Sequence, residues 1–158
     1  MVTSAPCPVS TAIGQAFGFS AGSSATLLTV QDQLTTLPSF TSLASNQHGQ
    51  FKAAVAYYPG CGLSNLLSLS SPDAYFPTVP LQVWHASLDP LYENCTTRQA
   101  QAAKAAIEHG ESTNPFALYA YEGAGHGFDS EPANDVEVAA QQDARPKTQA
   151  MFESLLNP

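Results

Sequence analysis

The sequence predicts an α/β fold, in which a mostly parallel sheet of about four strands is flanked by helices. Four short apolar segments have the length and composition of buried strands. Helical segments or long connections separate them, and parallel strands require such crossovers. The 158 residues contain no internal repeat and no linker that would divide them, so we expect one domain.

The first expected strand covers residues 15–19, with Ala16, Phe17 and Phe19 buried, and a helix follows at 21–30. The last expected helix starts near Pro146, because proline favours the first helical position. It would present Met151, Phe152, Leu155 and Leu156 on one face. The other expected elements are strands at 51–58, 80–85 and 115–121, a helix at 96–109 ended by Gly110, loops at 35–50, 61–79 and 128–145, and an irregular arm at 1–8.

The charge balance excludes several classes of partner. Thirteen acidic residues face five basic ones, which gives a formal net charge of −8. A basic groove for nucleic acid is therefore not expected, and an anionic membrane surface would repel the chain. No apolar run has the length of a membrane span, and residues 1–8 lack the features of a signal peptide. The sequence predicts a soluble protein but leaves its compartment open: cytoplasmic or, after removal of a signal, periplasmic or secreted.

Cysteine and histidine spacing indicates neither a disulfide framework nor a metal site. Cys61 and Cys95 each follow an expected strand, so a disulfide in an oxidising compartment and two separate thiols are both open. Cys7 lies in the arm. The histidines are scattered rather than paired at metal-ligand spacing, and no cofactor is expected; they are His48, His85, His109 and His126.

The most informative segment is Gly18-Phe19-Ser20-Ala21-Gly22, a Gly-x-Ser-x-Gly pattern between an expected strand and an expected helix. This setting is typical of a nucleophile elbow, where a strained turn presents a serine hydroxyl at a helix N-terminus. We expect glycine at both flanking positions because a side chain at either one would collide with neighbouring backbone.

Two further polar residues follow other expected strands. Asp89 comes after the strand at 80–85 and His126 after the strand at 115–121, so parallel strands would bring both to the edge that carries Ser20. The chain order serine, acid, histidine is that of the α/β-hydrolases. In this hypothesis Ser20 is the nucleophile, His126 its base and Asp89 the residue that orients the imidazole.

Alternatives exist for each of these residues. Asp89 precedes Pro90 and is also suited to start a turn, with Glu93 as the reserve acid. We expect His85 to be a packed residue bonded to backbone, and His109 to lie at a helix C-terminus. The N–H of Ala21 is the expected oxyanion donor.

Four segments together resemble the dienelactone hydrolase family of α/β-hydrolases, from about Val9 onward. The resemblance implies cofactor-free hydrolysis of esters or lactones. The namesake enzymes use a cysteine nucleophile where this chain has Ser20, which favours a general esterase. The segments are residues 18–22, 54–61, 80–90 with Cys95 beyond, and 121–129.

The chain departs from the family pattern ahead of the elbow. Family members carry several strands and helices there, including the loop with a second oxyanion donor, so we expect residues 1–158 to form a truncated or minimal domain with a partial α/β-hydrolase fold. The strand at 15–19 would then be an exposed apolar edge, which favours homo-oligomers. The leading function is a serine hydrolase of small carboxylic esters through an acyl-enzyme. The alternative is a non-catalytic module for binding or assembly.

Overall fold

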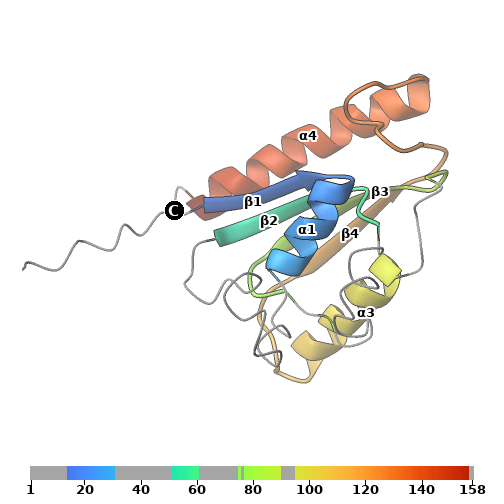
Figure 1. Cartoon of the computed structure of the whole chain (residues 1–158). Helices are drawn as coiled ribbons and strands as arrows, with labels where there is room; N and C mark the ends of the chain where they lie inside the picture. Colours follow the sequence, from blue (N-terminus) through green and yellow to red (C-terminus); the bar gives the residue numbers. More distant parts are fainter. Residues whose placement is uncertain (1–13, 31–50, 61–74, 76, 90–94, 157–158) are drawn as a thin grey trace, which may run out of the picture.

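The computed structural model describes residues 14–30, 51–60, 75, 77–89 and 95–156. Their core is a four-stranded sheet in which every neighbouring pair is parallel (Figure 1). The predicted α/β fold class is confirmed. The strands, in their order across the sheet, are β1 (Gly14–Phe19), β2 (Phe51–Tyr57), β3 (Leu81–Ala86) and β4 (Phe116–Tyr121).

Helices cover both faces of the sheet (Figure 1). Helix α1 (Ala21–Thr29) and helix α3 (Cys95–Glu108) lie on one face, and α4 (Asp135–Leu156) crosses the other. Helix α3 ends before Gly110, whose φ of 76° is the left-handed conformation expected of a glycine stop.

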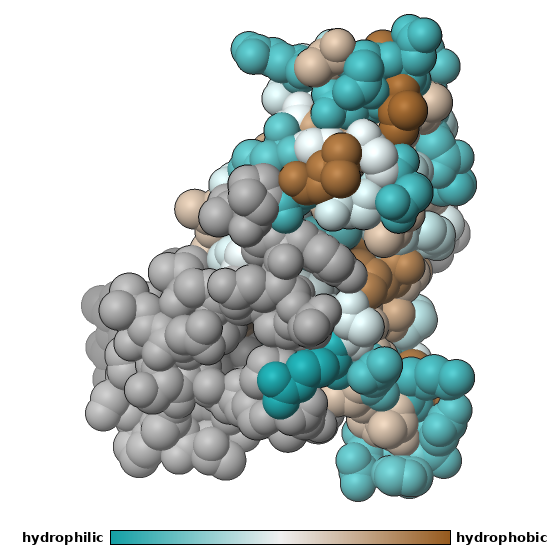
Figure 2. Space-filling view, turned by 90° about the vertical axis from the view of Figure 1, so that its right-hand side faces the viewer, coloured by the Kyte–Doolittle hydropathy of each residue, from teal (hydrophilic) through white to brown (hydrophobic). Residues whose placement is uncertain are grey.

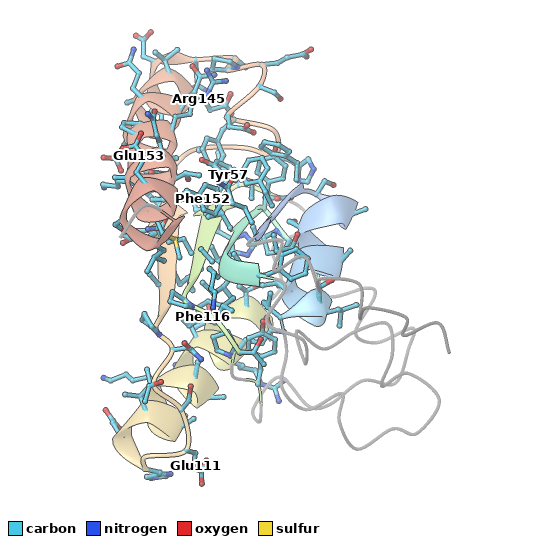
Figure 3. All side chains as sticks on the ribbon, turned by 90° about the vertical axis from the view of Figure 1, so that its left-hand side faces the viewer. Tyr57, Glu111, Phe116, Arg145, Phe152 and Glu153 are labelled. Atoms are coloured by element: carbon cyan, nitrogen blue, oxygen red, sulfur yellow. The ribbon has the colours of Figure 1, made fainter. Side chains whose placement is uncertain are left out.

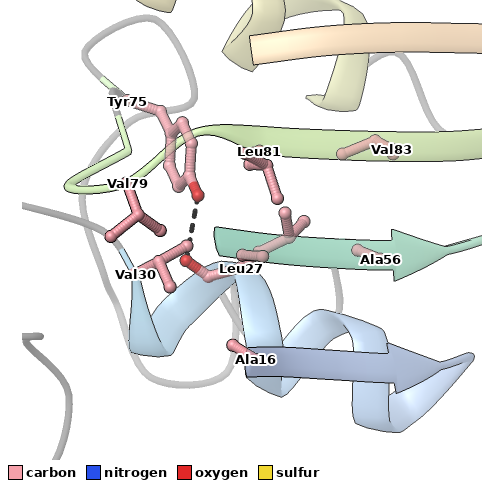
Figure 4. Packing of buried hydrophobic residues seen from close by; sticks show 9 residues of the cluster. Ala16, Leu27, Val30, Ala56, Tyr75, Val79, Leu81 and Val83 are labelled. Carbon is pink, nitrogen blue, oxygen red and sulfur yellow. Dashed lines mark hydrogen bonds between the residues drawn. The ribbon is translucent and has the colours of Figure 1, made fainter. Parts of the chain in front are cut away.

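Side chains of the central strands alternate between two hydrophobic clusters. Ala54 and Ala56 of β2 face α1, whereas Val55 and Tyr57 face α4. On the α1 side, the Tyr75 hydroxyl donates to the carbonyl of Leu27 at 3.0 Å (Figure 4). On the α4 side, the Thr148 hydroxyl is hydrogen-bonded to Tyr57 and to the Trp84 indole N–H, at 2.9 and 3.0 Å.

Helix α4 begins at Asp135, so the predicted start near Pro146 is wrong, and so is the predicted loop at 128–145 from Asp135 onward. The side chain of Asn134 accepts the N–H of Glu137 at 3.0 Å, which caps the helix well before the proline. Pro146 lies inside the helix, where it removes one backbone donor on an exposed turn. Met151 and Phe152 pack on the core as expected, but Leu155 is 36% exposed.

The expectation that Phe17 and Phe19 are buried is also wrong, because they are 45% and 42% exposed. Both side chains point to the α4 face, but α4 packs on β2 and leaves the β1 edge open. A groove of about 530 Å³ results between β1 and α4, with Phe152 projecting toward the sheet beside Tyr57 (Figure 3). Its lining is Gln15, Phe17, Phe19, Tyr57, Asp129, Arg145, Thr148, Gln149, Phe152 and Glu153.

The rest of the visible surface contains both hydrophobic and hydrophilic residues (Figure 2). On the face seen in Figure 2, hydrophobic residues form small separate patches among hydrophilic ones. Within the described part of the chain, no helix combines the length and apolar content that a membrane span needs.

Several expectations fall on residues outside those described. They concern the arm at 1–8, the loops at 35–50 and 61–74, His48, Cys61 and Glu93, and also the side chains of Cys95 and Leu156.

The two glycines that flank Ser20 differ in their surroundings. A Cβ at Gly18 would lie 2.4 Å from the carbonyl carbon and oxygen of Gly22. A Cβ at Gly22 would meet no described atom within 4 Å. The steric argument therefore holds for Gly18 only, and the expected collision at Gly22 is a wrong prediction.

His85 is almost fully buried at the end of β3, with Nε2 3.0 Å from the Thr96 hydroxyl. It packs as expected, although this partner is a side chain rather than backbone. Burial lowers its pKa from 6.5 to about 4; the nearby carboxylate of Asp89 opposes that shift and His126 adds to it. His85 is therefore neutral at neutral pH.

We expect Gly18→Ala to destabilise the fold by about 3 kcal/mol or more, because β1 and α1 must separate to admit the methyl group. Gly22→Ala is the matched control, and its stability should stay within about 1 kcal/mol of wild type. Urea unfolding of the three proteins measures both effects. Equal losses of unfolding free energy in the two variants would contradict the difference in packing between Gly18 and Gly22.

His85 should make stability depend on pH. Its folded pKa is below its unfolded value, so its contribution is complete above pH 6.5 and is lost as the pH falls toward about 4. The loss should be about 3 kcal/mol at most. Urea unfolding from pH 7 to pH 4 should show a steeper decline in wild type than in His85→Gln, which keeps a polar group beside Thr96. Parallel curves would refute this role.

Candidate active site

Ser20 occupies the turn between β1 and α1 with φ of 50° and ψ of −120°. A non-glycine residue at positive φ is strained, so its neighbours must hold it. Its N–H donates to the carbonyl of Tyr57 at 3.0 Å, and its own carbonyl accepts the N–H groups of Ser23 and Ser24 at 3.0 and 3.1 Å. The Ser23 hydroxyl donates to the same carbonyl at 2.5 Å. The elbow is thus tied to both the sheet and the helix.

Asp89 and His126 reach the same edge from β3 and β4. Asp89 closes a turn after β3, in which its N–H donates to the carbonyl of Ala86 at 3.2 Å. His126 lies in a loop after β4 between Gly123 and Gly127, whose φ values are 79° and 83°. These values favour glycine, which explains the glycine-rich sequence around the histidine.

The structure brings the three predicted residues within hydrogen-bonding distance. His126 Nδ1 lies 2.7 Å from Asp89 Oδ2, and His126 Nε2 lies 3.1 Å from Ser20 Oγ. A carboxylate only accepts, so Nδ1 carries the proton and donates to Asp89. In the neutral imidazole Nε2 is then the acceptor, and the Ser20 hydroxyl donates to it.

Burial differs sharply along this chain of hydrogen bonds. The Asp89 side chain is 0% exposed and that of His126 is 31% exposed. A buried carboxylate needs a charged or hydrogen-bonding partner, and His126 supplies one. Because His85 is neutral at neutral pH, it places no positive charge beside Asp89.

Residues that the sequence analysis did not select hold the histidine loop. The buried Glu137 carboxylate accepts the N–H of Gly125 at 2.9 Å and that of Ala133 at 2.6 Å. On the strand side, the N–H of Leu88 donates to the carbonyl of Ala124 at 2.9 Å. The spacing Asn134-x-x-Glu137 is close to a capping box, which was the available signal for Glu137.

The remaining predicted site residues have simpler surroundings. Ala21 begins α1, so its N–H has no partner within the helix and stays the predicted oxyanion donor. His109 is exposed just after α3. Among the described residues no cluster of three or more His, Cys, Asp or Glu side chains has the arrangement of a metal site.

Solved structures share the fold. Esterase 2 of the planctomycete Thermogutta terrifontis, phosphorylated by paraoxon, superposes with a TM-score of 0.60 at 22% identity, over 89% of this chain and 53% of that one. Its propionate-bound form gives a TM-score of 0.58 at 22% identity, with 89% and 55% covered. The chain therefore spans about half the length of these relatives. Among curated proteins, none matches significantly.

The family model for dienelactone hydrolases matches residues 39–156, which is most of the chain. The match begins after the elbow and includes both Asp89 and His126. It agrees with the resemblance noted in the sequence and with the parallel sheet. This chain belongs to the dienelactone hydrolase family.

Proposed function

We propose that this protein is a serine hydrolase that cleaves small carboxylic esters with Ser20, His126 and Asp89. The observation that carries the proposal is the continuous hydrogen-bond chain from Ser20 Oγ through the imidazole to the buried Asp89 carboxylate. Family membership supports the general chemistry, and the esterase relatives support the fold on which it takes place.

In the proposed mechanism, Ser20 Oγ attacks the ester carbonyl while His126 Nε2 takes its proton. Asp89 stabilises the imidazolium that forms. Collapse of the tetrahedral intermediate breaks the bond to the alkoxy oxygen, which receives the proton from His126 and leaves as an alcohol. Water then attacks the acyl-enzyme by the same route and releases the acid and free Ser20.

The negative charge that develops on the carbonyl oxygen in the transition state requires a hydrogen-bond donor beside it. The N–H of Ala21 is the proposed donor because it is at the N-terminus of α1, where negative charge is favoured. Loss of one such donor typically costs about 2.7–4 kcal/mol in the transition state. This is the one donor that we assign.

The proposed substrates are small esters without negative charge. Glu137 bonds to the N–H of Gly125, next to His126, and Asp129 lies three residues beyond the histidine. Both are buried, and the whole chain carries a net charge of −8. An anionic acyl group would be repelled by these carboxylates. The propionate-bound and butyrate-bound forms of the Thermogutta enzyme support a preference for short acyl chains.

The open edge of β1 favours a second proposal, association with another copy of this chain. Phe17 and Phe19 are exposed on β1, whose outer edge pairs with no strand among the described residues, an arrangement that promotes strand addition. The adjoining groove carries both Arg145 and Glu153, so a two-fold related copy offers each of them an opposite charge. If hydrolysis were absent, assembly through this edge would be the alternative function.

Activity is tested with 4-nitrophenyl propionate and its hemisuccinate analogue. We expect wild type to hydrolyse the propionate, and the rate to fall by about 10³-fold or more in Ser20→Ala. The kcat/KM for the anionic ester should be at least about tenfold below that for the neutral ester. A fluorophosphonate probe should label wild type but not Ser20→Ala. Unchanged hydrolysis in Ser20→Ala would remove Ser20 from the mechanism.

Association is tested by sedimentation velocity at micromolar concentration. Wild type should sediment as a dimer, and Phe17→Lys should be monomeric because it places a charge at the β1 edge. Ile107→Lys is the control, since Ile107 is similarly exposed, at 40%, but lies on α3. A monomeric wild type would overturn the proposal.

A further inference from the structure

Tyr58 follows β2 directly, lies next to the site and has an unusual backbone conformation. Its φ is 40°, and Ser20 and Tyr58 are the two non-glycine residues at positive φ in the described part of the chain. A bulky side chain in this conformation is strained, and such strain persists only where the surrounding structure enforces it. The N–H of Tyr58 donates to the carbonyl of Trp84 at 2.7 Å, which fixes the turn.

The Tyr58 side chain contacts the histidine loop at two points. Its ring centroid lies 4.5 Å from that of His126, with the two planes tilted by 57°. Its hydroxyl donates to Asp129 Oδ1, three residues further along the loop. Burial, and then the hydrogen bond to the Asp129 carboxylate, raise the pKa of Tyr58, so the hydroxyl keeps the proton that it donates.

Asp129 is itself firmly placed. It is 5% exposed, and its backbone carbonyl accepts from Gln141 and from Arg145, both on α4. The hydrogen bond from Tyr58 therefore connects the end of β2 to a point that α4 also holds. His126 lies between this point and Gly125, whose N–H bonds to Glu137.

We propose that Tyr58 is a positioning residue that holds the His126 imidazole in line with Ser20, through ring contact and through its hydrogen bond to Asp129. The end of β2 also supports the turn that carries the nucleophile, because the N–H of Ser20 donates to the carbonyl of Tyr57. The strained residue at the end of β2 thus fixes the base relative to the nucleophile at the end of β1. This proposal rests on the proposed serine hydrolase function.

The test compares Tyr58→Phe with Tyr57→Phe in the full chain. Both variants lose one buried hydroxyl, but that of Tyr57 bonds to Thr148, away from His126. We expect kcat to fall about 10- to 100-fold in Tyr58→Phe with KM within twofold of wild type, because a displaced base slows chemistry rather than binding. Tyr57→Phe should keep its kcat. Equal kcat values for wild type and Tyr58→Phe, or equal losses in both variants, would overturn the proposal.

A second measurement does not depend on turnover. In ¹⁵N-histidine-labelled protein, the His126 Nδ1 proton bonded to Asp89 should give a low-field resonance in wild type and in Tyr57→Phe. It should broaden or vanish in Tyr58→Phe, and an unchanged signal would contradict the proposal. If wild type were inactive but the resonance responded to Tyr58 alone, the positioning role would stand and the hydrolase function would fail.

If Tyr58→Phe does not fold, Asp129→Asn replaces it. This variant weakens the acceptor but keeps the shape of the side chain. It should lower kcat less than about tenfold and shift the His126 resonance. A wild-type resonance together with a wild-type kcat would again refute the proposal.

Discussion

The close approach of β1 and α1 at Gly18 is the constraint on which the rest of the site depends. A Cβ at Gly18 would lie only 2.4 Å from the Gly22 carbonyl. Because glycine has no Cβ, strand and helix come this close and are joined by a very short turn. That turn forces Ser20 to a φ of 50°. Hydrogen bonds from Ser20 to Tyr57 on one side and from Ser23 and Ser24 on the other hold the residue in this conformation. The strain is thus local, and its support comes from both layers of the fold.

The electrostatics of the site follow from one buried charge. The Asp89 side chain is out of contact with solvent, and an unpaired carboxylate there would be strongly unfavourable. Two imidazoles lie close to it, but they differ in their surroundings. His85 is buried and neutral, whereas His126 is partly exposed and bonds directly to Asp89. The hydrogen bond at 2.7 Å is thus to the more exposed of the two histidines.

The features that the sequence predicted well are those set by local patterns. Apolar segments, crossover lengths and the glycine pattern around Ser20 predict where the strands and α1 lie along the chain and that the strands are parallel. The contact between Ser20, Asp89 and His126 required only that parallel strands end at one edge. The exposure of Phe17 and Phe19 was not predictable in this way, because it depends on which strand α4 covers.

The start of α4 shows a second kind of failure. Proline is common at a first helical position, so Pro146 was interpreted as a start signal. The competing signal, Asn134 followed by Glu137, determines the actual N-terminus. A pattern search that weighted capping residues above proline would have placed the helix start correctly. The bond from Gly125 to Glu137 is a tertiary contact that this local pattern does not predict.

This helix also connects the site to the open groove. Its first turn carries Glu137, which bonds to Gly125, and its middle carries Arg145, which bonds to the carbonyl of Asp129. Arg145 and Asp129 also line the groove beside β1. The groove is therefore lined in part by residues that also hold the loop of His126. In this fold one helix, α4, both lines the groove beside β1 and holds the loop that carries His126.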